Sequence, residues 1–424
     1  MKFHNLSKES QVVDFSTAVR TGLGENQGLF FPKKFSAYNN VDELLELPVN
    51  QRNFNILKPF VEENLTDEQL LDVVQRTFAF PAKLKSVTKN TYCLELFHGP
   101  TLAFKDFGAT FMASCLKYFS NGEKITILTA TSGDTGAAVA HAFYGIENIE
   151  VVILYPQGKI SDLQEKMFTT LGGNIRTVAI KGTFDDCQQL VKQSFDDREL
   201  VRKIGLNSAN SINISRLLAQ VCYYFDAVAQ LPKEKRQQAV ISVPSGNFGN
   251  LTAGIIAKLL GLPIKRFIAT TNINDTVPRY LETGEWLPKD TIATLSNAMD
   301  VSQPNNWPRI EYMIESNQFD RALLKGESVD EEQTKQAMLE LNNKNYISEP
   351  HAAVAYHGLN ESLTNDEIGI FLGTAHPAKF KESVDEILGL DLPLPIELEK
   401  CASKPGLSIE MGNSFELLRK LLVS

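Results

Sequence analysis

Short apolar runs alternate with longer stretches of helical periodicity along most of the chain. Seven runs rich in Val, Ile, Leu and Thr predict buried strands: Tyr92–Phe97, Ile125–Thr131, Val151–Tyr155, Ile175–Ile180, Val240–Val243, Phe267–Thr271 and Ile368–Leu372. Helical patterns follow most of them, most clearly over Gly136–Tyr144, Ser211–Ala229, Gly249–Leu260 and Pro377–Leu388. Several runs are continuously apolar, which is typical of parallel sheets covered on both faces. The pattern predicts an α/β fold with parallel sheets covered by helices.

The apolar pattern differs in two stretches of the chain. The first 78 residues contain acidic helical stretches and no strong strand, and the segment near 272–348 is polar and poor in strands. A polar, proline-containing stretch at Leu231–Gln238 favours a boundary there. We therefore expect an N-terminal helical subdomain and two α/β domains, over residues 1–78, 79–235 and 236–424. The segment near 272–348 is expected to be an insert or a mobile covering region of the last domain.

Composition narrows the class of function. The 424 residues include 42 Lys plus Arg and 51 Asp plus Glu, a formal net charge of −9, which disfavours nucleic-acid and membrane partners. Five cysteines without CxxC spacing argue against a disulfide framework or a structural zinc site and favour a reducing compartment. No secretory h-region and no long apolar span are visible, so a cytoplasmic location is expected. A monomer or weak dimer is expected.

Four unusual segments each begin where a predicted strand ends: His98–Phe107, Thr131–Gly136, Pro244–Asn250 and Gly373–Phe380. In open α/β sheets, ligands bind beyond the carboxyl ends of the strands. Four such loops therefore predict one composite site for a small-molecule ligand.

Two of these loops have the chemistry of an anion site. Pro244–Asn250 contains two glycines and opens a helix, so its N–H groups can face an anion, although a plain strand-to-helix turn fits the spacing equally well. Thr131–Gly136 adds three hydroxyls and suits a carboxylate or phosphate. The alternative there is an ordinary helix N-cap formed by Ser132 or Asp134.

Two further groups are candidates for chemistry. Lys105 lies among apolar residues, so it either extends to solvent or has a lowered pKa and a nucleophilic neutral amine. Asn210, Ser211 and Arg216 surround a helix start and suit a second phosphate, unless they are a cap and a surface arginine. The six histidines show no metal-ligand spacing, so no metal site is predicted. No G-x-S-x-G elbow occurs, which disfavours a serine hydrolase.

The run HGPTLAFKDFGATFMA resembles the threonine synthase family, within the fold type II (tryptophan synthase β-like) enzymes that depend on pyridoxal 5'-phosphate (PLP). Further blocks resemble that family in order along nearly the whole chain: VRTGLGENQGLFFP, TATSGDTGAAVAHAF, LNSANSINISR, SVPSGNFGNLTAG, SNAMDVSQPNNW and GTAHPAKF. The long N-terminal portion and the insert are similar to the longer members of the family.

The resemblance implies a PLP cofactor and a role for each loop. Lys105 is the implied Schiff-base lysine and proton shuttle, and Thr374 is the implied partner of the pyridine nitrogen. The implied ligands of the cofactor phosphate are Gly246, Asn247, Phe248, Gly249 and Asn250. Those of the substrate carboxylate are Thr131, Ser132, Gly133, Asp134 and Thr135. Those of the substrate phosphate are Asn210, Ser211 and Arg216.

The implied reaction converts O-phospho-L-homoserine and water to L-threonine and phosphate, the last step of threonine biosynthesis. Another fold type II phospholyase or amino-acid lyase, or a PLP-binding protein without turnover, stays an alternative. The role implied for Asp134 fits least well, because an anionic side chain repels a neighbouring substrate carboxylate. Either this side chain points elsewhere or its charge is compensated.

Overall fold

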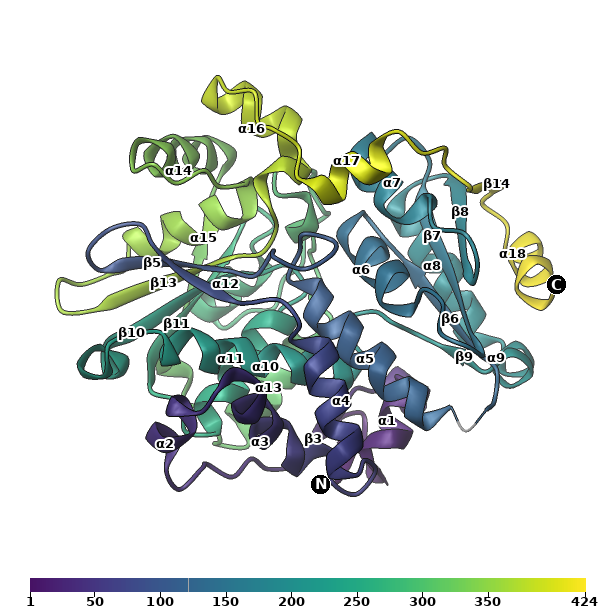
Figure 1. Ribbon diagram of the computed structural model, residues 1–424, viewed down its shortest axis with the longest axis horizontal. Coiled ribbons are helices and arrows are strands. Elements are labelled where there is room, and N and C mark those ends of the chain that lie inside the picture. The colour runs from purple at the N-terminus through teal and green to yellow at the C-terminus, as the bar shows by residue number, and fades with distance from the viewer. Residues whose placement is uncertain (121) are drawn as a thin grey trace.

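The larger of two parallel-rich sheets holds six strands and forms one half of the molecule (Figure 1). The computed structural model describes residues 1–120 and 122–424. The strand order is β12 (Leu324–Ser328), β11 (Ile264–Thr271), β10 (Ala239–Pro244), β13 (Ile368–Gly373), β5 (Thr91–Glu95) and β4 (Lys83–Ser86). All neighbours pair in parallel except β4 and β5, which are antiparallel.

The second sheet has five strands, all paired in parallel. Its order is β14 (Ile409–Gly412), β8 (Ile175–Lys181), β7 (Ile149–Pro156), β6 (Ile125–Ala130) and β9 (Leu206–Asn207). Every one of the seven predicted strands is confirmed in one of the two sheets, with ends that differ by a few residues. The α/β prediction is therefore confirmed.

Helices cover the sheets and fill the space between them (Figure 1). Those between residues 79 and 235 are α5 (Lys105–Phe119), α6 (Asp134–Phe143), α7 (Asp162–Thr169), α8 (Phe184–Asp196), α9 (Arg198–Ile204) and α10 (Ile214–Ala229). Those that follow are α11 (Gly249–Leu259), α12 (Thr276–Thr283), α13 (Trp307–Glu315), α14 (Glu331–Asn343), α15 (Pro350–Asn360), α16 (Lys381–Leu388), α17 (Ile396–Ala402) and α18 (Phe415–Val423). Short 3-10 turns are η1 (Glu25–Gln27), η2 (Lys233–Gln238), η3 (Asn297–Met299), η4 (Arg321–Leu323) and η5 (Pro377–Phe380).

The N-terminal subdomain holds helices and also a small sheet. Its helices are α1 (Phe15–Thr21), α2 (Val41–Glu46), α3 (Val49–Val61) and α4 (Asp67–Thr77). No strong strand was expected there, and the structure adds three short or exposed ones: β1 (Phe3–Asn5), β2 (Lys8–Val13) and β3 (Phe30–Pro32) form an antiparallel sheet. The apolar pattern gives no signal there, because β2 is mostly exposed and polar, and β1 and β3 have three residues each.

Strand pairing does not follow the expected linear division at 235/236. The strands β4 and β5 precede that boundary but pair into the sheet of β10, β11 and β13. Conversely, β14 near the C-terminus returns to the edge of the sheet of β6, β7 and β8. The insert contributes the edge strand β12, so it is part of the larger sheet as well as a covering region.

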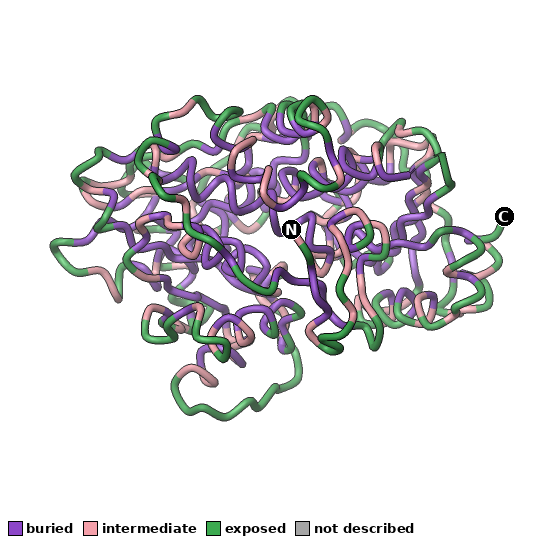
Figure 2. The backbone as a smooth tube through the Cα atoms, turned by 90° about the horizontal axis from the view of Figure 1, so that it is seen from below, coloured by how far each residue is buried: buried purple, intermediate pink, exposed green. Residues whose placement is uncertain are grey.

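The helix α10 lies at the centre of the core, and every residue from Ile214 to Val228 is buried. It packs against α5 on one side and α11 on another. In Figure 2 the buried backbone runs continuously through the middle of the molecule, with the exposed segments at its periphery. The core therefore joins the two sheets rather than forming two separate centres.

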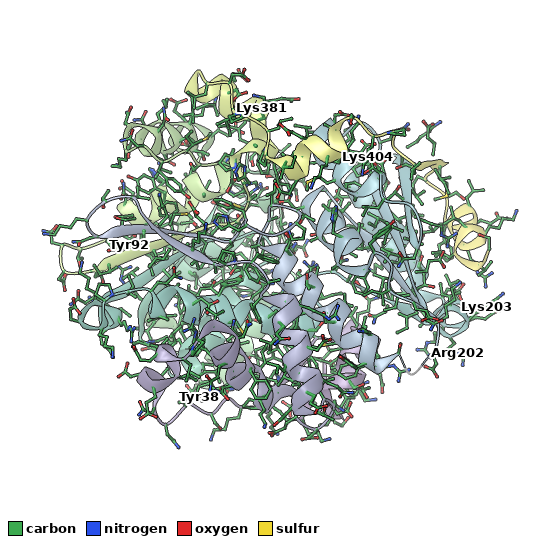
Figure 3. All side chains as sticks on the ribbon, viewed as in Figure 1. Tyr38, Tyr92, Arg202, Lys203, Lys381 and Lys404 are labelled. Atoms are coloured by element: carbon green, nitrogen blue, oxygen red, sulfur yellow. The ribbon has the colours of Figure 1, made fainter. Side chains whose placement is uncertain are left out.

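The N-terminal subdomain is held to this core by polar contacts as well as apolar ones. The Tyr38 backbone N–H donates to the Leu260 carbonyl at 2.9 Å, and the side chain, labelled in Figure 3, packs against Phe225 of α10. Arg52 on α3 forms a buried ion pair with Asp226 on α10 at 2.6 Å. The Arg52 guanidinium also donates to the Leu45 and Leu47 carbonyls, at 3.1 and 2.9 Å.

Removing the arginine of this pair will leave Asp226 buried without a counter-ion. We expect Arg52→Met to lower the free energy of unfolding by about 3–5 kcal/mol, as for other broken buried pairs. Denaturant unfolding at neutral pH measures the change. The double variant Arg52→Met/Asp226→Leu is the control, since it removes both charges and is expected to recover much of the loss. A single variant as stable as the wild type would contradict this account.

Candidate active site

The four predicted loops all follow the carboxyl ends of strands. Three of these strands, β10, β13 and β5, are adjacent in the larger sheet, so their loops leave one edge. The fourth loop, Thr131–Gly136, follows β6 in the other sheet and leads into α6. A buried ion pair between Asp134 and Lys379, at 2.6 Å, joins this loop to the Gly373–Phe380 loop. The structure thus brings loops from both sheets to one place.

The loop that carries Lys105 is fastened to the loop after β13. The Phe104 N–H donates to the Thr374 carbonyl at 2.8 Å, and the His376 N–H donates to the Leu102 carbonyl at 3.0 Å. Leu102 has a left-handed backbone, with φ of 58°. Such strain in a residue with a side chain is characteristic of functional loops. Thr374 is buried directly after β13, beside the Lys105 loop.

Lys105 is the first residue of α5, and its side chain is enclosed enough to change its protonation. Burial lowers the pKa of Lys105 to about 8, and the nearby cations Arg216 and Lys379 act in the same direction. The Asp134 carboxylate opposes the shift. At pH 7 about a tenth of this amine is therefore neutral and nucleophilic, far more than for an ordinary lysine.

Asp134 is buried, and its charge is compensated. Burial raises the pKa of Asp134, but the charges of Lys379 and Lys105 outweigh it and hold the value at about 2. The Lys379 ammonium also donates to the Thr101 carbonyl at 2.8 Å. The open question about Asp134 is thereby answered. Lys379 itself was missed from the sequence, although it lies within the Gly373–Phe380 segment.

The Thr131–Gly136 loop is organised by its first hydroxyl. The Thr131 Oγ1 accepts hydrogen bonds from the Gly133 and Gly136 N–H groups, at 3.0 and 2.8 Å. This hydroxyl therefore shapes the loop rather than facing a ligand. Ser132 and Thr135 are half-buried on the same loop. Gly133 has φ of 139°, a conformation that favours glycine.

The Pro244–Asn250 loop is backed by the insert. A Cβ at Gly246 would lie 2.8 Å from the Ala298 carbonyl oxygen, so only glycine fits there. The Asn247 carbonyl accepts from the Asn306 N–H at 3.1 Å. Phe248 caps α11 with a left-handed φ of 61°. The helix start is thus held in a fixed, partly strained turn of the kind that presents N–H groups to an anion.

Asn250, at the start of α11, has an unused donor. Its Oδ1 accepts from the Tyr223 and Tyr224 hydroxyls of α10, at 2.5 and 2.8 Å. Its buried Nδ2 has no partner among residues 1–120 and 122–424. A buried donor left unpaired is costly unless a ligand meets it. Sequence reasoning missed both tyrosines, because nothing in the spacing of α10 shows that they face Asn250.

Arg216 is a buried cation rather than a surface residue. One guanidinium nitrogen donates to the Ala209 carbonyl at 2.5 Å, while Nε has no partner in the described part of the chain. Burial lowers the pKa of Arg216 to about 10. No carboxylate among the described residues forms an ion pair with it. These surroundings favour an anionic ligand.

Asn210 and Ser211, which precede Arg216, each contact another part of the site. The Thr129 hydroxyl donates to Asn210 Oδ1 at 2.5 Å, which ties this loop to the end of β6. The Asn306 amide donates to the Ser211 hydroxyl at 3.3 Å. Because Asn306 also contacts Asn247, the two predicted phosphate loops lie side by side.

The known relatives agree with this site. A family described as pyridoxal-phosphate dependent enzymes matches residues 79–370, so the fold and site define a PLP-dependent enzyme. Families described as the threonine synthase N terminus and C-terminal part match residues 2–78 and 352–422. The chain is 62% identical to the threonine synthase of Haemophilus influenzae and 60% identical to that of Escherichia coli, over 100% of both chains in each case.

Solved structures give the same result. The crystal structure of threonine synthase from Escherichia coli matches with a TM-score of 0.96 and covers 100% of this chain and 99% of that one. The PLP-bound threonine synthase of Brucella melitensis, 30% identical, matches with a TM-score of 0.93 over 100% and 99%. The chain belongs to the threonine synthase family, and PLP is its cofactor. The unpaired Asn250 donor, the open start of α11 and the low pKa of Lys105 all fit this group.

The pKa of Lys105 predicts how the amine captures its cofactor. Only the neutral amine reacts, so the rate constant for PLP capture by the apoprotein should rise about tenfold per pH unit below pH 8 and level off above it. Stopped-flow absorbance of the cofactor measures the rate. A rate that keeps rising at the same slope to about pH 10 would show an ordinary lysine pKa.

The crossing of α5 and α10 sets the position of Lys105 relative to Arg216. A Cβ at Gly108 would lie 2.7 Å from the Arg216 carbonyl oxygen, which is backbone and cannot rotate away. We expect Gly108→Ala to push the helices apart, to cost about 1–3 kcal/mol of stability, and to weaken PLP binding. Gly412→Ala is the control, because nothing lies within 4 Å of a Cβ there. Equal PLP affinity in both variants would contradict the prediction.

Proposed function

We propose that this chain converts O-phospho-L-homoserine and water to L-threonine and phosphate, with Lys105 as the lysine that binds PLP and moves the protons. The observation that carries the proposal is the placement of a lysine of low pKa between two loops suited to anions. The Thr131–Thr135 loop suits the carboxylate of an amino acid. The buried guanidinium of Arg216, whose Nε has no partner among the described residues, suits the phosphate of a phosphorylated amino acid.

The cofactor is assigned to the loops of the larger sheet. The backbone N–H groups of Gly246–Asn250 hold its phosphate, and the Thr374 hydroxyl meets its pyridine nitrogen. When bound, PLP supplies an electron sink that acidifies the protons on the substrate carbons. The strained turn at Phe248 and the contacts from Asn306 keep the phosphate loop in place before the cofactor arrives.

The substrate is assigned to the loops that flank Lys105. Ser132 and Thr135 donate to its carboxylate, while Thr131 and Gly133 shape that loop. Asn210, Ser211 and Arg216 hold its phosphate, and the buried guanidinium stabilises the charge on the departing group. The neutral Lys105 amine removes the proton from the substrate Cα and returns a proton after water has added at Cβ.

We also propose that the protein acts in the reducing cytoplasm as a monomer or weak dimer. Its five cysteines are all free and buried. None of the described helices has the length and apolar character needed to cross a membrane. The net charge of −9 disfavours a nucleic-acid partner.

Product analysis tests the proposal directly. The wild type should release threonine and phosphate in equal amounts from O-phospho-L-homoserine. The substitution Lys105→Ala should lower the rate at least about 10³-fold. The matched control is Lys117→Ala, which removes an exposed lysine from the same helix and should keep full activity. Arg216→Met should raise KM for the phosphorylated substrate. Phosphate with 2-oxobutanoate instead of threonine would contradict the proposal and indicate a phospholyase.

A further inference from the structure

Lys379 is a buried cation at the meeting point of the two sheets. Its side chain is 1% exposed, and it contacts Asp134 at 2.6 Å. Its other partner in residues 1–120 and 122–424 is the Thr101 carbonyl, at 2.8 Å. One side chain from η5 thus joins the loop before α5 to the loop that begins α6.

A second acid continues this chain of contacts to the start of α5. The Thr101 N–H donates to Asp106 Oδ2 at 2.8 Å, and its hydroxyl bonds the other carboxylate oxygen. The contacts therefore run from Asp106, next to Lys105, through Thr101 and Lys379 to Asp134. Both lysine and carboxylates are buried, so their interactions are screened little by solvent.

The acidic residue in the Thr131–Thr135 loop is a liability for a loop that receives a carboxylate. A buried Asp134 without a counter-ion would repel such a ligand and would also draw the proton of Lys105. Lys379 reduces both effects, because its charge offsets that of Asp134. Its tie to the Thr101 carbonyl keeps the ammonium in place on the side of Lys105.

We propose that Lys379 is a positioning and specificity residue, the counter-ion that lets an acidic loop bind the carboxylate of the substrate. The inference rests on the proposed function, in that the Thr131–Thr135 loop is taken as the carboxylate site. Lys379 acts through Asp134 rather than by contact with the reacting atoms. The pair also fixes the distance between the carboxylate loop and the helix that carries Lys105.

The test compares two probes on the PLP-loaded protein. The first is the phosphonate isostere of the substrate, in which a methylene replaces the bridging oxygen, and the second is the same compound without its carboxyl group. Isothermal titration calorimetry gives the Kd of each. Lys379→Met should weaken the first probe on the order of 100-fold, because Asp134 is left unpaired, and should change the second by less than about fivefold.

The double variant Lys379→Met/Asp134→Asn makes the test decisive. Removing the uncompensated charge should bring the Kd of the carboxylate probe back to within about fivefold of the wild type. A double variant as weak as Lys379→Met, or an equal loss for both probes, would overturn the proposal and leave a purely structural lysine.

Threonine production by the wild type, measured alongside, separates this inference from the proposed reaction. If the wild type makes no threonine, but Lys379→Met loses affinity only for the probe with a carboxylate, the role of Lys379 is supported and only the reaction is contradicted. A wild type that makes threonine, with no difference between the two probes in Lys379→Met, would contradict only the role of Lys379.

Discussion

The charge balance around one buried amine is the constraint on which the rest of the site depends. Lys105 has to be neutral to react, while the same enclosed space has to receive anionic groups. Burial and the cations Arg216 and Lys379 lower its pKa, and Asp134 limits how far it falls. The value of about 8 that results is low enough for a nucleophile and high enough for a base near neutral pH.

The same cations explain how a chain of net charge −9 can hold anionic ligands. Exposed cations such as Arg202, Lys203 and Lys404 lie at the periphery (Figure 3) and are screened by solvent. Arg216 and Lys379 are buried at the meeting point of the sheets, where a charge acts more strongly. Local burial therefore matters more for binding than the overall charge does.

The sequence predicted what depends on local pattern. Strands, most helices and the convergence of four loops follow from apolar periodicity and from the rule that parallel strands share a carboxyl edge. The N-terminal sheet was missed because β2 is polar and exposed. The linear domain division fails for β5 and β14, because a parallel sheet joins strands that are distant in sequence.

The missed site residues share one cause. Lys379 acts through Asp134, and Tyr223 acts through Asn250, so each role exists only once tertiary contacts have formed. The spacing of residues indicated Arg216 as a candidate ligand. Its burial, however, depends on the packing of α5 on α10, and this burial distinguishes an anion site from a surface arginine. The roles of Lys105 and Arg216 rest on enclosure as much as on residue type.

The central claim is that Lys105, and not the neighbouring Lys379, holds the cofactor. Borohydride reduction of the PLP-loaded protein fixes the cofactor to the lysine that carries it, and peptide mass spectrometry then locates that lysine. The account predicts the cofactor mass on the peptide that contains Lys105, and its loss in Lys105→Ala. Label on the peptide that contains Lys379 would contradict the account, because that amine is already engaged by Asp134 and the Thr101 carbonyl.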